Sequence, residues 1–340
     1  MFSSLKRLFF ASQRPAPPPA RPRPTSVHEK PGAALPDAPG ISLSPAQIDA
    51  AFYGLVLGVN SMLDREPNGF ETRALRDLDR LLAADVTHSD LVPRLPAVIP
   101  RVMTALRDED SSAADLAAEL GRDAVLVSEV LRLSNSALYR AGKEITSLER
   151  AVFTLGRTGI RQLVANAALK PLLNPKSGHF SQLSGTLLWE QSEKAAVACD
   201  YLAKAEHVDR FHAYLTAIVQ NVGFAVALQV LDRRFDGSEA PHSQRFREQW
   251  VKRSRRLAVL IADEWEFPPA VLDVLKGRSE ERQPNQESML DTVVHTGDLL
   301  AKAHLLSRRG RIDCKPTPAI ELPAPRLARH IARCCERLED

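Results

Sequence analysis

From Ser44 onward, apolar residues recur at the three- and four-residue spacing of α-helices, and this periodicity constrains the fold more than any other feature of the sequence. The stretch SPAQIDAAFYGLVLGV starts with a serine at the N-cap position and a proline at the first helical position. No convincing run of alternating apolar and polar residues is present. The sequence therefore predicts an all-α fold, and a hydrophobic content of 44% in 340 residues is ample for a core.

The predicted helices fall into two blocks, separated by cap and breaker residues. The first block is expected over residues 95–108, 111–123, 124–139, 147–156 and 158–173. The second is expected over residues 185–205, 211–231, 255–277 and 288–306, with a terminal helix over 324–338. That terminal helix carries an apolar stripe of Leu327, Ile331, Cys334 or Cys335, and Leu338. We expect its cysteines to pack against the core rather than to bind a ligand.

The first 40 residues differ in composition from the rest of the chain. Residues 1–14 are predicted to form a short basic amphipathic tail, for which disorder without a special role is the favoured interpretation. Weak peripheral contact of residues 1–10 with a membrane surface stays open as the alternative. Residues 15–40 contain nine prolines, which exclude a helix and favour an extended, disordered linker. We therefore expect the folded part of the chain to begin near Ile41.

Charge and cysteine content limit the classes of function and the compartment. The net charge is +3, but residues 1–28 contribute five basic and no acidic side chains, so the remainder carries about −2. This balance gives no electrostatic argument for nucleic-acid binding. The four cysteines show no paired or metal-binding spacing, which predicts free thiols in a reducing, cytoplasmic environment.

An amide pair, Gln220 and Asn221, interrupts the apolar stretch FHAYLTAIVQNVGFAVALQVL. Burying an amide without a hydrogen-bond partner costs roughly 1 to 3 kcal/mol in proteins. We therefore expect this pair to have specific partners in the folded protein.

The segment DLAAELGRDAVLVSEVLRL has the helix, glycine and second helix of a helix-turn-helix motif. Its second helix, however, presents mainly Ser128, Glu129 and Arg132 among apolar residues. A recognition helix needs basic and amide side chains for phosphates and base edges. Paired-helix packing is therefore the favoured interpretation of this segment.

Three further stretches make the chain resemble the HDOD family, the HD-related output domains of bacterial signalling proteins. They are LVPRLPAVIPRVMTALRDED, LAAELGRDAVLVSEVLRLSNSALY and ITSLERAVFTLGRTGIRQLV. The resemblance implies a two-lobed, multi-helix domain over residues 91–305, with an N-terminal helical lobe and an HD-like helical bundle. Residues 41–90 then form an additional helical segment, and residues 306–340 form a C-terminal extension. The polar residues Ser134, Asn135 and Ser136 suit a helix end, where we expect a structural role.

The resemblance also implies where a metal centre would lie. In the HD superfamily, active phosphohydrolases bind metal through a histidine, an adjacent His-Asp pair and a later aspartate, which lets the metal activate water. The matching positions in this chain are Gln191, Gln220, Asn221 and Asp298. Other positions that often hold histidine in related sequences are Ser254 and Gly277 with Arg278.

One carboxylate and three neutral amides make a poor site for a divalent cation. We therefore expect no catalytic residues, no bound metal and no cofactor. The amides and Asp298 can instead satisfy one another in a polar cluster. Binding of a small polar ligand or nucleotide in the same cleft stays open as an alternative. His295 and Asp298 share a helix face, but no third ligand of suitable spacing accompanies them.

The segment RFREQWVKRSRR is the densest basic patch of the predicted folded part. Its cations form a candidate partner-binding face: Arg245, Arg247, Lys252, Arg253, Arg255 and Arg256. A plain solvated helix face is the other interpretation, and nucleic acid is a less favoured partner.

The sequence thus leads us to expect a non-catalytic regulatory protein of bacterial signal transduction, which binds protein partners or responds to a small ligand. Two alternatives stay open. One is a residual metal-dependent phosphohydrolase, and the other is a nucleic-acid-binding regulator that uses the basic patch.

Overall fold

The computed structural model describes residues 43–84, 89–93, 117–118, 120–121, 124–136, 144–173, 178–282, 286–312 and 320–339. All of them belong to the compact unit that spans residues 34–340. The predicted tail, the linker and the predicted helix over 95–108 lie outside the described residues, as does most of the one over 111–123.

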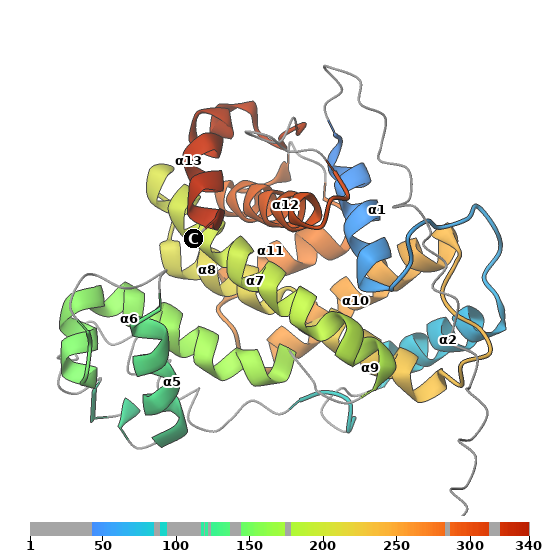
Figure 1. Cartoon of the computed structure of the whole chain (residues 1–340), viewed down its shortest axis with the longest axis horizontal. Coiled ribbons are helices and arrows are strands. Elements are labelled where there is room, and N and C mark those ends of the chain that lie inside the picture. Colours follow the sequence, from blue (N-terminus) through green and yellow to red (C-terminus); the bar gives the residue numbers. More distant parts are fainter. Residues whose placement is uncertain are drawn as a thin grey trace, which may run out of the picture. The chain divides into compact units, whose positions relative to one another are not determined.

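The described part of the chain is helical, as predicted (Figure 1). Apart from two isolated bridges, Leu43 with Ile320 and Leu63 with Ser243, it contains no β-pairing. The helices are α1 (Pro45–Val56), α2 (Gly69–Ala83), α5 (Ala124–Ser134), α6 (Leu148–Leu173), α7 (His179–Ala205), α8 (Arg210–Val219), α9 (Val222–Arg234), α10 (Gln244–Glu264), α11 (Pro269–Ser279), α12 (Met289–Arg308) and α13 (Ala328–Glu339), with a 3₁₀ turn η3 (Pro325–Leu327).

The N-terminal lobe is built from α5 and the first part of α6, which pack against each other. Its apolar cluster contains buried residues such as Val130, Ile160 and Leu163, and it is separate from the main core. Within α6 the backbone leaves helical geometry at Gly156, where φ is 66°. A residue with a side chain rarely adopts this conformation, so the glycine allows two helical segments to meet at a kink. Both segments were expected from the sequence.

Asn135 stabilises the C-terminal end of α5 through hydrogen bonds, as expected for a polar residue at a helix terminus. Its Nδ2 donates to the carbonyls of Leu131 (2.9 Å) and Ile145 (2.8 Å), and its Oδ1 accepts from the Ile145 amide (2.8 Å). One side chain thereby satisfies backbone groups of α5 and of the segment that leads into α6. The structural role predicted for this residue is confirmed.

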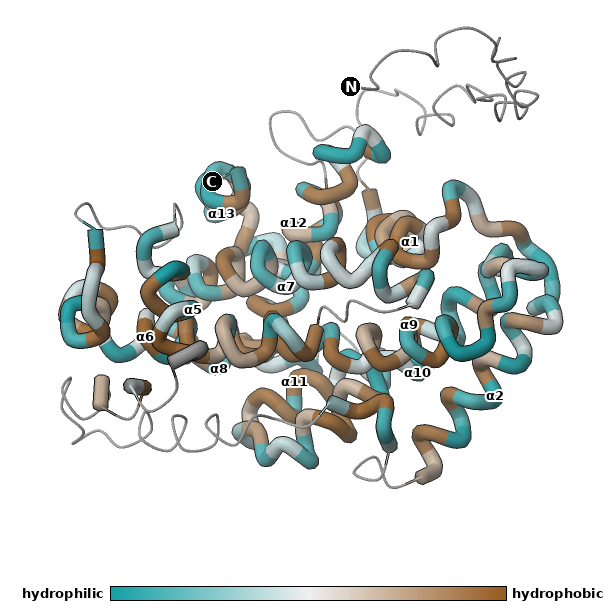
Figure 2. Tube along the Cα trace, turned by 60° about the horizontal axis from the view of Figure 1, so that its bottom comes forward, coloured by the Kyte–Doolittle hydropathy of each residue, from teal (hydrophilic) through white to brown (hydrophobic). Residues whose placement is uncertain are grey.

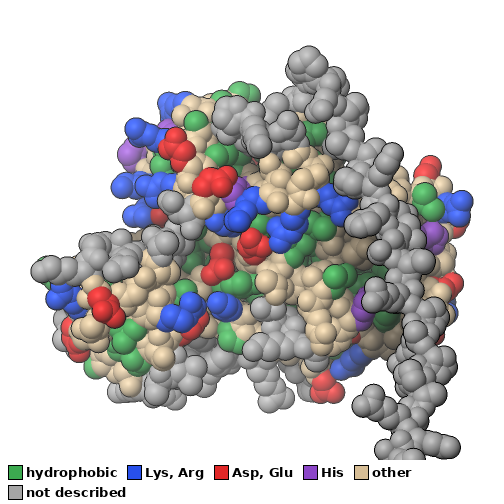
Figure 3. Space-filling model, in the orientation of Figure 1, with side chains coloured by type: hydrophobic (Ala, Val, Ile, Leu, Met, Phe, Trp, Pro, Cys, Tyr) green, Lys and Arg blue, Asp and Glu red, His purple; other side chains and the backbone are tan. Residues whose placement is uncertain are grey.

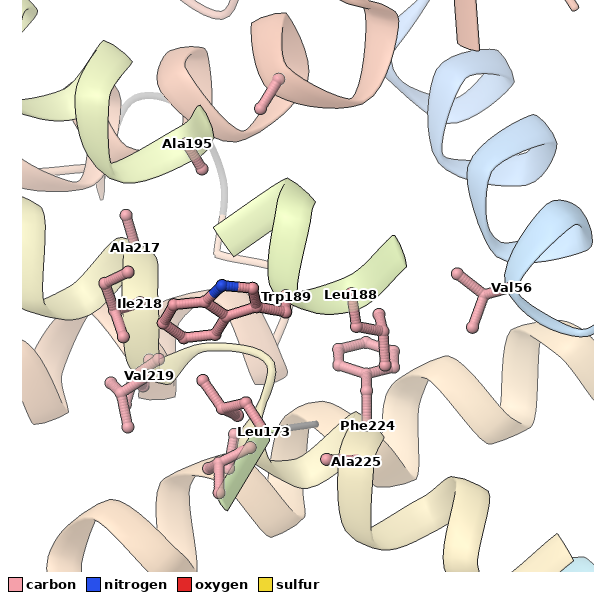
Figure 4. Packing of buried hydrophobic residues seen from close by; sticks show 14 of the residues in the cluster. Val56, Leu173, Leu188, Trp189, Ala195, Ala217, Ile218, Val219, Phe224 and Ala225 are labelled. Carbon is pink, nitrogen blue, oxygen red and sulfur yellow. The ribbon is translucent and has the colours of Figure 1, made fainter. Parts of the chain in front are cut away.

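The main core surrounds α7, which packs against α8, α9, α12 and α13. Figure 4 shows Trp189 of α7 close to Ile218 and Val219 at the end of α8, with Leu188 beside Phe224 of α9. Apolar and polar residues alternate along the helices that surround this centre (Figure 2). Where α9 crosses α10, a Cβ on Gly223 would lie 1.9 Å from the Ser254 carbonyl oxygen. Only glycine lets these two backbones approach so closely.

Helices α1 and α2 belong to the same core. Helix α1 packs on α10 and α12, and α2 packs on α9 and α10. Their rings Phe52, Tyr53 and Phe70 are buried, and Tyr53 stacks on Phe224 with 4.8 Å between the ring centroids. The segment that the sequence set apart as residues 41–90 thus supplies part of the wall of the HD-like bundle.

The apolar stretch that contains the amide pair spans α8 and α9. Residues Arg210–Arg234 are long and apolar enough to cross a membrane by composition, but 94% of their most apolar window is buried inside the protein. That burial is typical of a core helix. At the C-terminus, α13 buries Ile331, Cys334 and Leu338, which confirms the predicted stripe with Cys334 as the more buried of the two cysteines.

Candidate functional site

Four side chains that lie far apart in the sequence meet in the HD-like bundle. Gln191 comes from α7, Gln220 and Asn221 from the junction of α8 and α9, and Asp298 from α12, and all four are buried. The Gln191 Nε2 donates to Asp298 Oδ1 at 2.6 Å, and the Gln220 Nε2 donates to the same oxygen at 3.3 Å. Asn221 Nδ2 donates in turn to Gln191 Oε1. These four side chains form what we call the amide–aspartate cluster.

The break between α8 and α9 explains why two adjacent amides can both point inward. Helix α8 ends at Val219 and α9 begins at Val222, so Gln220 and Asn221 occupy the turn between them. Asn221 Nδ2 also reaches Ser192 Oγ (2.9 Å) and the Leu188 carbonyl (3.3 Å). The partners that we expected for this amide pair are present, so the pair avoids the cost of unpaired burial.

The second carboxylate oxygen of Asp298 is held by two cations. Lys302 Nζ donates to Oδ2 at 2.8 Å, and Arg278 Nη2 donates to Oδ2 at 2.6 Å. Lys302 also donates to Asp49 Oδ1 at 2.7 Å and to the Tyr53 hydroxyl at 3.2 Å. The Lys302 side chain is 1% exposed, which is rare for a lysine without such partners.

A fifth charged group, Arg255 of α10, completes this arrangement. Its Nη2 donates to Asp49 Oδ2 at 2.8 Å, so that Asp49 receives both Arg255 and Lys302. We call the set of Asp49, Arg255, Arg278, Asp298 and Lys302 the ionic network. It links α1, α10, α11 and α12 around the amide–aspartate cluster.

Mutual attraction keeps the network charged in spite of burial. Burial raises the pKa of Asp298, but Lys302 and Arg278 outweigh it, and the resulting pKa lies below the usual value. Burial likewise lowers the pKa of Lys302, yet Asp298 and Asp49 raise it well above its usual range. For Asp49, the cations Lys302 and Arg255 overcome burial and hold the pKa far below normal. Both carboxylates are therefore ionised at neutral pH.

These residues do not fit a divalent metal ion. The amide–aspartate cluster offers one carboxylate and no imidazole, and Asp298 already accepts from two amides and two cations. A metal ion there would stand beside the ammonium of Lys302 and the guanidinium of Arg278. Nowhere in the described ranges do three or more His, Cys, Asp or Glu side chains form a group able to hold a metal. His295, the other ligand considered from the sequence, lies 3.5 Å from Glu287.

Sequence reasoning missed most of the ionic network. Asp298 and Lys302 are four residues apart on α12, which is the spacing of an ion pair on a helix, but nothing local shows that the pair is buried. Asp49 is a single carboxylate on the otherwise apolar α1, more than 200 residues away from its partners. A charged residue on an apolar helix face is the one signal that could have identified it.

The candidate basic face needs correction. Arg255 belongs to the ionic network and not to an open surface. Arg253 forms a bidentate pair with Asp79 of α2 (2.8 and 2.9 Å), Arg245 pairs with Glu66, and Arg247 lies 3.5 Å from Glu248. For Arg253 and Arg255 the reason is that α10 packs beside α2 and α1, which supply Asp79 and Asp49. Lys252 and Arg256 are the exposed cations of the segment for which the structure gives no ion pair among the described residues.

Basic and acidic side chains are also interspersed on the face shown in Figure 3. Charge of one sign is therefore not concentrated over this face as it would be on an extended site for nucleic acid.

Comparisons with known proteins agree with this architecture. The HDOD domain model matches residues 92–280, more than half of the chain, and the chain belongs to the HDOD family. An uncharacterized protein of Treponema pallidum (strain Nichols) is 26% identical over 149 residues, which cover 43% of this chain and 28% of that protein. The match thus spans little more than a quarter of that relative's length.

Two crystal structures share the fold. An HDOD domain protein of unknown function from Geobacter sulfurreducens superposes with a TM-score of 0.53 at 21% identity, over 78% of this chain and 89% of that one. A protein from Shewanella amazonensis SB2B, named "Putative metal-dependent phosphohydrolase", gives a TM-score of 0.54 at 20% identity, over 72% of this chain and 91% of that one. At these identities the likeness concerns the fold.

The ionic network predicts that Asp298→Asn destabilises the protein strongly. The change leaves Lys302 and Arg278 buried with an incomplete set of partners, and loss of one member of a buried ion pair costs about 3 to 5 kcal/mol. Denaturant unfolding followed by circular dichroism measures the loss. Asp273→Asn is the matched control, because Asp273 pairs with Arg282 at the surface and is 58% exposed. We expect the control to lose less than about 1 kcal/mol, and equal losses in the two variants would contradict the assignment.

Proposed function

We propose that this HDOD protein is a non-catalytic regulatory component of bacterial signal transduction, which acts in the cytoplasm by binding other proteins. The observation that carries the proposal is that the carboxylate of Asp298 is already hydrogen-bonded and ion-paired within the protein. Both of its carboxylate oxygens are engaged by side chains of the protein itself.

Hydrolysis of a phosphate ester in an HD-type centre needs a metal ion that lowers the pKa of a bound water molecule. Here the positive charge beside Asp298 comes from Lys302 and Arg278, and neither side chain can coordinate or activate water as a metal does. The amide–aspartate cluster also offers no histidine as a general base. In place of a metal centre, these helices therefore present an aspartate that is already paired with side-chain cations, which supports a structural role for it.

For the partner surface, the exposed cations Lys252 and Arg256 of α10 are the remaining candidates from the basic segment. They do not hold the fold together, whereas Arg253 and Arg255 are committed to Asp79 and Asp49. A protein surface with acidic side chains would complement two exposed cations. For a nucleic acid, these two exposed cations offer less positive charge than the six cations that the sequence suggested.

Back-substitution of the ligand positions tests the catalytic part of the proposal. We expect the triple variant Gln191→His, Gln220→His, Asn221→Asp to lack phosphodiesterase activity with Mn²⁺ or Fe²⁺, because Lys302 and Arg278 still engage Asp298. The measurement is turnover of bis-p-nitrophenyl phosphate, with the wild-type protein assayed beside it. Metal-dependent turnover by the wild-type protein would overturn the proposal in favour of a residual phosphohydrolase.

Charge reversal tests the partner surface. We expect Lys252→Glu with Arg256→Glu to reduce retention of a co-purifying protein at least tenfold in affinity capture, without a change in unfolding temperature. The matched control reverses two exposed lysines elsewhere, Lys204→Glu with Lys276→Glu. If both double variants and the wild-type protein retain the same partners equally, α10 is not the binding face.

A further inference from the structure

The ionic network is not electrically neutral. It contains two carboxylates, Asp49 and Asp298, and three cations, Arg255, Arg278 and Lys302. One positive charge therefore remains in a mostly buried site. An uncompensated buried charge is costly, so proteins supply a counter-charge where they can.

Within the network, Arg278 is the cation with an unused hydrogen-bond donor. Arg278 Nη2 is used by Asp298, but its Nη1 is buried and has no hydrogen-bond partner among the residues that the structure describes. A buried donor of a charged group that lacks a partner calls for an explanation. Arg278 lines a small cavity of about 10 Å³.

The lining of this cavity has the character of an anion site. Arg255 and Arg278 supply cations, and Gln220 and Tyr53 supply polar groups, while Phe224 and Leu275 form its apolar part. No carboxylate lines it among the described residues. Asp49 and Asp298 contact the same arginines from outside the cavity. The walls come from α1, α9, α10, α11 and the turn between α8 and α9, so the whole bundle positions them.

We propose that this cavity binds one small monovalent anion of halide size, with Arg278 and Arg255 as its principal partners. A water molecule could satisfy the Nη1 donor, but it would leave the excess charge in place. An anion does both. Room for the centre of a single water-sized particle admits a halide more readily than a tetrahedral oxyanion or a nucleotide phosphate.

A second pocket lies beside the small cavity. It has a volume of about 200 Å³, and it shares Arg255 and Arg278 with the small cavity. Its remaining charged lining is mainly acidic, with Glu281, Glu287 and Asp291 against Arg282. Such a rim does not itself concentrate anions, so Arg255 and Arg278 are the cations on which the proposed site depends. The anion site depends only on the geometry of the fold, so it is independent of the proposed regulatory function.

Thermal unfolding in different sodium salts tests the site in solution. At constant ionic strength, replacement of the bulky anion gluconate by chloride should raise the unfolding temperature by about 2 to 5 °C and the effect should saturate. The Arg278→Gln variant should lose this saturable rise. The control Arg282→Gln, which changes an arginine of the outer pocket, should keep it. The proposal is overturned if chloride produces no rise in the wild-type protein, or if the rise does not saturate.

Crystallography with bromide keeps the test independent of how well Arg278→Gln folds. Crystals of the wild-type protein soaked in bromide should show an anomalous peak within hydrogen-bonding distance of Arg278 Nη1. An ordered water molecule there without bromide would overturn the proposal. A bromide peak without any saturable effect in solution would mean binding at crystal concentration only and would also count against it.

Discussion

The pairing of Asp298 with Lys302 and Arg278 is the interaction on which the centre of this protein depends. Three cations and two carboxylates are largely removed from water together, and each would be costly to bury alone. Their mutual attraction, together with hydrogen bonds from Gln191 and Gln220, makes that burial tolerable. The helices α7, α8, α11 and α12 are consequently held in one arrangement around a single carboxylate.

The same network explains the position of α1. Asp49 accepts from both Lys302 and Arg255, and Tyr53 lies over the Lys302 ammonium, 4.6 Å from Nζ to the ring centroid. Helix α1 thus contributes one of the two carboxylates as well as apolar surface to the core. An HD-like centre of this composition needs the segment that precedes the HDOD match at residues 92–280. We therefore regard α1 as part of the working unit.

Much of the fold could be predicted from local sequence signals. The N-cap of Ser44, the two helical segments on either side of Gly156 and the stripe of α13 all depend on neighbouring residues, and the structure confirms each of them. That Gln220 and Asn221 lie beside Gln191 and Asp298 could be predicted only from the family resemblance. Lys302 and Asp49 were not identified from the sequence, and Arg255 was assigned to the basic face. A charged residue on a helix looks solvent-exposed until the packing of distant helices is known.

Arg255 shows most clearly that the role of a charged residue can depend on a distant helix. In the sequence it is one of six neighbouring cations, but in the fold it turns away from them toward Asp49. Residue spacing within one helix could not reveal this, because the partner lies 206 residues away on α1. The same separation hides the excess positive charge of the network, which appears only when all five groups are counted together.

The central claim is that side-chain cations take the place of a metal ion in the HD-like centre. The most direct test is the metal content of the purified protein after incubation with Mn²⁺ or Fe²⁺, combined with its unfolding temperature before and after treatment with a chelator. The account predicts far less than one metal ion per chain and the same unfolding temperature in both states. Stoichiometric metal, with an unfolding temperature that falls on chelation, would contradict it.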